Sequence, residues 1–222
     1  MLPWITLDVA AVPGGGELRL MRRGDEFSIM SGSVELMNSR RGGSEKALAS
    51  LACARLRGRT RPHVLIGGLG MGFTLRAALA DLPMEASVVV AELVPAVVAW
   101  ARGPMAEMFG TCLADSRVGI HEGDVGELMG APGAAFDAIL LDVDNGPDGL
   151  TRQANDRLYG AAGLQAAQKA LRAGGVLAIW SAAPDREFPL RLKRAGFSVD
   201  TATARSNGGR GARHTIWLAT RR

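Results

Sequence analysis

Residues 64–72 read VLIGGLGMG, and this stretch decides the fold of the 222-residue chain. A short apolar run breaks into glycines, and a run suited to a helix, 73–82, follows directly. In α/β proteins a buried strand that ends in such a turn binds nucleotide-like ligands, because the backbone comes close to the ligand and free N–H groups at the helix start face its anionic part. We therefore predict a cofactor loop. Its glycines are Gly67, Gly68, Gly70 and Gly72.

Acidic residues follow at the ends of the next two predicted strands. Glu92 lies near the end of a strand predicted over 87–93, about 20 residues past the glycine loop, where a carboxylate can accept both ribose hydroxyl hydrogens of an adenosine. Asp124 follows a strand predicted over 117–122, and it suits either an adenine amino group or the N-cap of a short helix at 125–129. The cofactor contacts predicted at these two strand ends are Glu92, Leu93, Gly123 and Asp124.

A third acidic segment, DVDNGPDGL at 142–150, follows a strand predicted over 136–141. Open parallel sheets bind ligands at the carboxyl ends of their strands. Several carboxylates there would hold a cationic substrate, and one with a raised pKa would take a proton from an attacking ammonium. We predict Asp142 as a cofactor contact and catalytic residue, and Asp144 as a second catalytic residue. For Asp144 and Asp148 the alternative is a simple turn, since Asp, Asn, Gly and Pro are all turn residues.

The composition is that of a globular protein, with 47% hydrophobic and 22% charged residues. No stretch approaches the roughly 18 apolar residues of a membrane helix, and the first ten residues lack the basic region of a signal peptide. Cys53 and Cys112 have no CxxC motif or histidine cluster beside them, which argues against a disulfide or a metal site. We predict a cytoplasmic protein with no bound metal and no membrane partner.

An isoelectric point near 9.7 makes nucleic-acid binding an alternative to weigh. The basic residues are scattered along the chain rather than grouped in an arm, and aromatic residues make up only 5% of it, too few to act as stacking platforms. Nearly all the positive charge is arginine, which together with abundant alanine and glycine suggests genomic base composition. A nucleic-acid partner is therefore disfavoured.

The chain divides into two parts by its pattern. Short extended segments separated by glycine-rich turns predict an N-terminal cap of two β-hairpins over 1–43. The remainder, 44–222, begins with a helix over 44–56 that has Ser44 as its N-cap. From residue 61 onward strands and helices alternate, which predicts a parallel sheet covered on both faces.

Further elements complete this second part. The other strands are predicted at 64–66 and 176–180, and the other helices at 95–109, 158–172 and 188–195. Gly174 and Gly175 are predicted to stop the 158–172 helix before the next strand. The segments 197–204 and 214–220 predict a closing antiparallel hairpin.

With these elements placed, roughly residues 15–220 resemble the spermidine synthase family, within the class I S-adenosylmethionine-dependent methyltransferase superfamily. The resemblance lies in the glycine loop, the strand end AEL, the segments DSRVGIHEGD and FDAILLDVDNGP, and the run LYGAAGLQAAQKALRAGGVLAIWSA. It implies a Rossmann-like α/β fold with a seven-stranded, mostly parallel sheet and an antiparallel C-terminal hairpin, plus the cap. It also implies an S-adenosylmethionine or decarboxylated S-adenosylmethionine cofactor, a small-molecule amine substrate and a homodimer.

The chain departs from that family at positions that matter for the chemistry. The family's glycine loop typically reads GGGDG, and its Asp faces the amine of the aminopropyl group, whereas 68–72 contains no acid. The carboxylate of intact S-adenosylmethionine needs N–H donors and would be repelled by an Asp. The family's cap Gln and its Tyr-His-Glu segment are also missing, and 44–47 reads SEKA instead. Asp142 matches the family Asp beside the attacking amine, so we expect a small amine as the acceptor. Because the loop acid is missing, we expect transfer of a methyl group rather than an aminopropyl group.

Two other functions stay open at this point. The missing family residues allow a non-catalytic or regulatory protein that binds S-adenosylmethionine without turnover. The glycine loop also permits an NAD-linked oxidoreductase, which is disfavoured because the later acidic strand ends fit an adenosyl sulfonium better than a hydride-transfer site.

Overall fold

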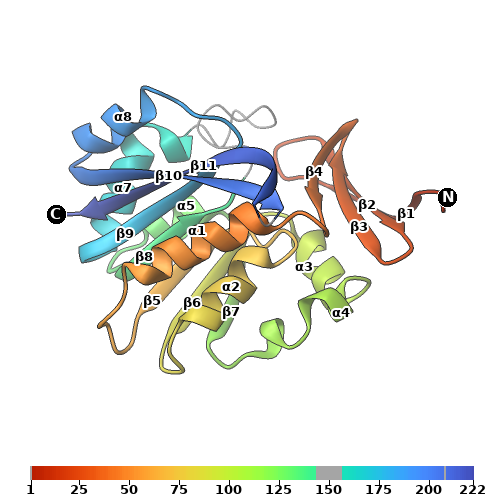
Figure 1. Cartoon of the computed structure of the whole chain (residues 1–222). Helices are drawn as coiled ribbons and strands as arrows, with labels where there is room; N and C mark the ends of the chain where they lie inside the picture. Colours follow the sequence, from red (N-terminus) through yellow and green to blue (C-terminus); the bar gives the residue numbers. More distant parts are fainter. Residues whose placement is uncertain (1, 144–156, 208) are drawn as a thin grey trace.

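The computed structural model describes residues 2–143, 157–207 and 209–222. Asp144 and Asp148 lie outside the described residues. Two sheets organise the chain, a four-stranded one near the N-terminus and a seven-stranded one formed by the rest (Figure 1). No helix in the described ranges is long and apolar enough to cross a membrane.

The N-terminal sheet is an antiparallel meander. Its strands are β1 (Ile5–Ala11), β2 (Glu17–Arg23), β3 (Glu26–Ser31) and β4 (Val34–Asn38). Leu18, Leu20 and Ile29 alternate toward one buried face, as expected of a sheet that packs on one side only. The two predicted hairpins are thus joined through β2–β3 pairing into one sheet, which we call the cap sheet.

The large sheet has the strand order β10-β11-β9-β8-β5-β6-β7. Its strands are β5 (His63–Gly67), β6 (Ser87–Glu92), β7 (Val118–Glu122), β8 (Phe136–Leu141), β9 (Leu171–Ser181), β10 (Phe197–Asn207) and β11 (Arg210–Arg221). The first five are mutually parallel, whereas β11 pairs antiparallel with both β9 and β10. This arrangement confirms the predicted Rossmann-like α/β fold and its closing hairpin.

Helices cover both faces of the large sheet, as predicted. They are α1 (Gly43–Ala54), α2 (Phe73–Asp81), α3 (Pro95–Arg102), α4 (Ala106–Phe109), α5 (Val125–Gly130), α7 (Ala161–Ala170) and α8 (Phe188–Arg194), with a 3-10 turn, η1, at Cys112–Ala114. Buried residues of α1, α2 and α3 form one apolar cluster, which also includes the cap sheet, and those of α5, α7 and α8 form the other. Strand β5 is buried from Val64 onward because Val64 and Ile66 face the first cluster and Leu65 the second.

Ser44 is not the N-cap that the sequence predicted. Helix α1 begins at Gly43 after Gly42, and no side chain caps it. Ser44 is instead fully buried and hydrogen-bonds Glu45 and His214. Ser44 lies within the first turn of α1, where its hydroxyl bonds these two side chains instead of a backbone N–H of the helix start.

Two predicted helices are shorter than expected. The segment 95–109 breaks into α3 and α4 because Pro104 has no backbone N–H and disfavours helix in Gly103 before it. The segment 158–172 contributes α7 only from Ala161, since Gly160 is its N-cap, and α7 ends at Ala170. Residues 157–159 are also helical, and Gly160 separates them from α7.

Gly174 and Gly175 do not stop the helix, because they lie inside β9. Leu171 already pairs with Phe136 and Val176 pairs with Ala138, so the residues between them bulge out opposite Asp137. Gly174 has φ +70°, which suits such a bulge. The buried Asp137 carboxylate accepts hydrogen bonds from Arg172 in the bulge and from Arg59, and these bonds hold it in place.

Candidate active site

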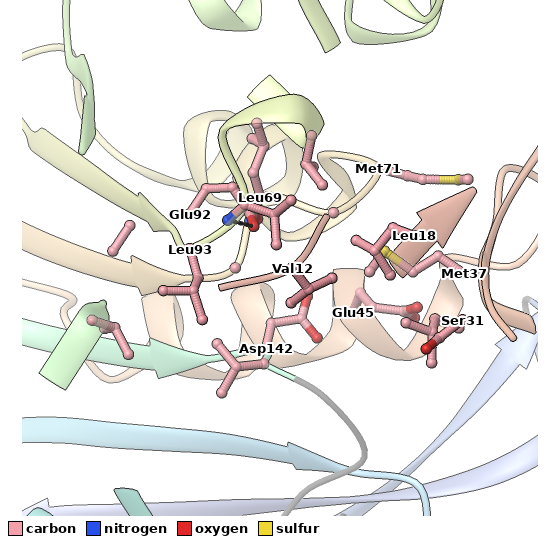
Figure 2. Close-up of a pocket in the computed structure, with 18 of the residues that line it drawn as sticks. Val12, Leu18, Ser31, Met37, Glu45, Leu69, Met71, Glu92, Leu93 and Asp142 are labelled. Carbon is pink, nitrogen blue, oxygen red and sulfur yellow. Dashed lines mark hydrogen bonds between the residues drawn. The ribbon is translucent and has the colours of Figure 1, made fainter. Parts of the chain in front are cut away.

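The carboxyl ends of the parallel strands open into one cavity of about 250 Å³ beneath the cap sheet. The loops after β5, β6, β7 and β8 all line it, and the cap sheet and its loops contribute the facing wall (Figure 2). The cavity lining includes Met37, Arg41, Glu45, Gly68, Leu69, Gly70, Glu92, Leu93, Gly123, Asp124, Asp142 and Trp180. The strand ends that the sequence singled out therefore converge on a common hollow.

The glycine loop packs so closely against its neighbours that two of its positions have no room for a side chain. Gly68 has φ +91°, and a Cβ there would lie 2.4 Å from the carbonyl oxygen of Asp142. Gly70 has φ +49°, and a Cβ would lie 2.9 Å from Met37 Sδ of the cap sheet. Gly68 and Gly70 line the cavity, whereas Gly67 and Gly72 are not among its lining residues. Gly67 ends β5, and Gly72, with φ +70°, is the N-cap of α2.

Glu92 is buried at the end of β6. One carboxylate oxygen accepts the Leu69 N–H at 2.9 Å and the other accepts the Val94 N–H at 2.9 Å. Burial raises the pKa of Glu92, and these backbone hydrogen bonds oppose the rise. The carboxylate thus ties the glycine loop to β6.

Glu92→Gln is expected to lower the free energy of unfolding by about 1–3 kcal/mol, because the amide NH₂ cannot accept one of the two buried backbone N–H groups. Thermal denaturation of the unliganded protein measures this. The matched control is Glu122→Gln, since Glu122 pairs in register with Glu92 at the end of β7 but is exposed. Equal stability of the two variants would show that Glu92 does not hold the loop.

Asp124 occupies the predicted place after β7 and acts as the N-cap of α5. Its Oδ1 accepts the Gly126 N–H at 2.7 Å, and its Oδ2 forms an ion pair with Arg157. Gly123 lies next to it, with its N–H donated to the Glu92 carbonyl at 2.9 Å. The N-cap alternative is therefore present in the structure. Asp124 also lines the cavity, where adenine contact stays a prediction.

Asp142 follows β8 at the middle of the sheet edge. Thr74, near the start of α2, donates its hydroxyl to Asp142 Oδ2 at 2.5 Å. Burial, and after it the charge of Glu45, raises the pKa of Asp142 to about 7, although the Thr74 hydrogen bond acts in the opposite direction. A carboxylate with this pKa exchanges a proton readily near neutral pH, as a general base must.

Solved structures provide the comparison with known proteins. Spermidine synthase from Thermotoga maritima superposes with a TM-score of 0.75 at 17% identity, over 98% of this chain and 73% of the synthase. A spermidine synthase in complex with the transition-state analogue AdoDATO gives 0.74, also at 17% identity, over 98% and 72%. The chain has the spermidine synthase fold. Human methyltransferase-like protein 13 in complex with SAH shares the core, with a TM-score of 0.61 at 21% identity over 81% of this chain and 82% of that protein.

These likenesses confirm the predicted resemblance in fold, and they include the cap sheet because the synthases match almost the whole chain. No family model matches the sequence, and no curated protein does. At sequence identities this low, the comparison shows the fold but does not establish the roles of individual site residues.

Sequence reasoning missed three residues that line the cavity or hold its side chains in place. Glu45 lines the cavity from α1, and Thr74 holds Asp142 from α2. Trp180 lines the cavity at the end of β9, and its indole ring packs edge-on against His214 with ring centroids 4.6 Å apart. The buried Trp180 Nε1 has no hydrogen-bond partner in the described ranges. Only the missing Tyr-His-Glu segment, with SEKA in its place, pointed toward Glu45.

Proposed function

We propose that the protein is a spermidine synthase-like transferase that binds S-adenosylmethionine and moves a methyl group, rather than an aminopropyl group, to a small amine. The observation that carries the proposal is a half-buried Asp142 with a raised pKa in the same cavity as a glycine loop that carries no acidic side chain. When bound, the cofactor would supply an electrophilic carbon beside a sulfonium.

The residues present fit an adenosyl cofactor. Gly68 and Gly70 have no side chains. A Cβ at Gly68 would clash with Asp142, and a Cβ at Gly70 would clash with Met37. Glu92 and Leu93 at the end of β6, with Gly123 and Asp124 after β7, would hold the nucleoside. The loop has no acid to repel a methionine carboxylate, and Arg41, whose guanidinium pairs with Glu35 at 3.5 Å, is among the residues that line the same cavity. These features support intact S-adenosylmethionine over its decarboxylated form.

The acceptor side of the cavity suits a cation. Asp142 and Glu45 face it together (Figure 2), so Coulomb attraction favours an ammonium. Attack requires a neutral amine, and Asp142 would take the proton from the bound ammonium. Holding the amine in line with the reacting carbon would supply much of the remaining rate.

Calorimetry with three nucleosides tests the proposal. We expect S-adenosylmethionine to bind at least about tenfold more tightly than decarboxylated S-adenosylmethionine, because a charge-assisted hydrogen bond to its carboxylate contributes about 1.5–3 kcal/mol. Methylthioadenosine, which lacks the amino-acid part, is expected to bind more weakly than S-adenosylmethionine. If none of the three binds, the proposal is wrong, and if the decarboxylated form binds best, the transferred group is an aminopropyl.

The pH dependence of turnover follows from Asp142. The base must be ionised to accept a proton, so kcat should fall as the pH drops through the pKa of about 7 and level off above it. Initial rates of methyl transfer between pH 5.5 and 9, with the amine at saturation, measure this. A rate that is independent of pH across that range would remove Asp142 from the role of base.

A further inference from the structure

A hydrogen-bonded chain of three side chains lies behind the acceptor side of the cavity. Glu45, in the first turn of α1, lines the cavity, and the Ser44 hydroxyl donates to Glu45 Oε2 at 2.6 Å. His214 Nδ1, on β11, lies 2.7 Å from the same hydroxyl oxygen. A hydroxyl has one hydrogen, so Ser44 accepts from His214 while it donates to Glu45.

The chain joins the cavity to the outside of the domain. Ser44 is fully buried, which shields both of its hydrogen bonds from water. His214 is only half-buried, and the Trp180 ring packs against one side of it. The three residues therefore connect a carboxylate inside the cavity to an imidazole that has access to solvent.

Glu45 acts electrostatically on Asp142 and on His214. After burial, its charge is the next cause that raises the pKa of Asp142, and it also raises the pKa of His214 against the lowering by burial. Two basic residues near Glu45 in the chain have partners of their own. Arg41 pairs with Glu35 at 3.5 Å, and Lys46 lies over the Phe73 ring.

We propose that Glu45 is a second carboxylate of the acceptor site and that Ser44 and His214 form its path for releasing a proton to solvent. The inference rests on the proposed amine transfer. Converting an ammonium and a sulfonium into an alkylated ammonium and a neutral thioether releases one proton. Asp142 would receive that proton and pass it to Glu45 across the shared cavity.

Release then follows the chain in reverse. His214 first exchanges protons with water, so that its hydrogen moves from Nδ1 to Nε2 and Nδ1 can accept. Protonated Glu45 then donates to Ser44 Oγ, and Ser44 donates its own hydrogen to His214 Nδ1. The resulting imidazolium loses its Nε2 proton to water, which restores the neutral ring. Ser44 and His214 are positioning residues here, because they act only through Glu45.

A titration of the unliganded protein tests the connection without any assumption about turnover. The histidine ring resonances of the full chain are followed by NMR against pH in the wild type, in Glu45→Gln and in the control Glu107→Gln, an exposed glutamate on α4. Glu45→Gln should move the His214 midpoint to lower pH and leave those of His63 and His121 in place. An unchanged His214 midpoint overturns the proposal.

Turnover measurements test the release path itself. Glu45→Gln should raise KM for the amine about tenfold, as expected for loss of one charged contact, and shift the acid limb of kcat to lower pH. His214→Ala should lower kcat, with recovery when imidazole is added, whereas the control His63→Ala should show no response to imidazole. Ser44→Ala should lower kcat without any imidazole recovery.

The two experiments separate the possible failures. A wild-type protein that turns over no amine contradicts the proposed function, while the titration still reports on the hydrogen-bonded chain. Normal turnover with no change of pH profile in Glu45→Gln and no imidazole recovery in His214→Ala overturns the release path alone.

Discussion

Asp142→Asn is expected to lower kcat for amine methylation by about 100- to 10,000-fold, the usual contribution of a general base. Asparagine has nearly the same shape, and its carbonyl oxygen can still accept the Thr74 hydroxyl that now bonds Asp142 at 2.5 Å. The variant should therefore fold normally and bind S-adenosylmethionine nearly as well as the wild type. It lacks only the carboxylate that accepts a proton.

Stopped-time product assays and calorimetry on the same preparation measure the two effects separately. Asp200→Asn is the matched control, because Asp200 is an exposed carboxylate on β10 whose partner, Arg55, is also at the surface. Full turnover in Asp142→Asn would show that another group is the base. Loss of cofactor binding in that variant would make Asp142 part of the nucleoside site instead.

The strand ends could be predicted from the sequence because their signals are local. A buried apolar run followed by glycine or an acid marks the carboxyl end of a parallel strand, and all such ends meet at one edge of the sheet. Glu92, Asp124 and Asp142 each follow such a run, and each lines the cavity. Even the two alternatives for Asp124 were visible, because Asp before a helix is both a common N-cap and a polar strand end.

The wall of the site could not be predicted, because it depends on contacts between residues far apart in the chain. Ser44 and His214 are 170 residues apart, and a local pattern favoured a helix cap for Ser44. Likewise Gly174 and Gly175 carry the signature of a helix stop, yet pairing on both sides of Asp137 turns them into a bulge. Tertiary packing decides in such cases, and only the arrangement of the sheet reveals it.

Gly68→Ala is expected to be the most damaging change to the loop. Gly68 lies in the left-handed region at φ +91°, and an added Cβ would lie 2.4 Å from the Asp142 carbonyl oxygen, a backbone atom that cannot rotate away. Left-handed backbone costs alanine roughly 1–2 kcal/mol, and overpacking costs a further 1–3 kcal/mol or so. The free energy of unfolding should fall by about 2–5 kcal/mol, and Asp142 should be displaced, so that cofactor affinity and turnover fall together.

Gly58→Ala separates the two contributions to that loss. Gly58 has nearly the same φ, +93°, but nothing lies within 4 Å of the position that a Cβ would take. It should therefore show the backbone cost alone, about 1–2 kcal/mol, with normal cofactor binding. Chemical denaturation of both variants gives the difference, which measures how tightly the glycine loop is packed against the strand end that carries Asp142. If the two variants lose equal stability and Gly68→Ala still binds the cofactor, the close approach of the Gly68 and Asp142 backbones is not the reason for a glycine at position 68.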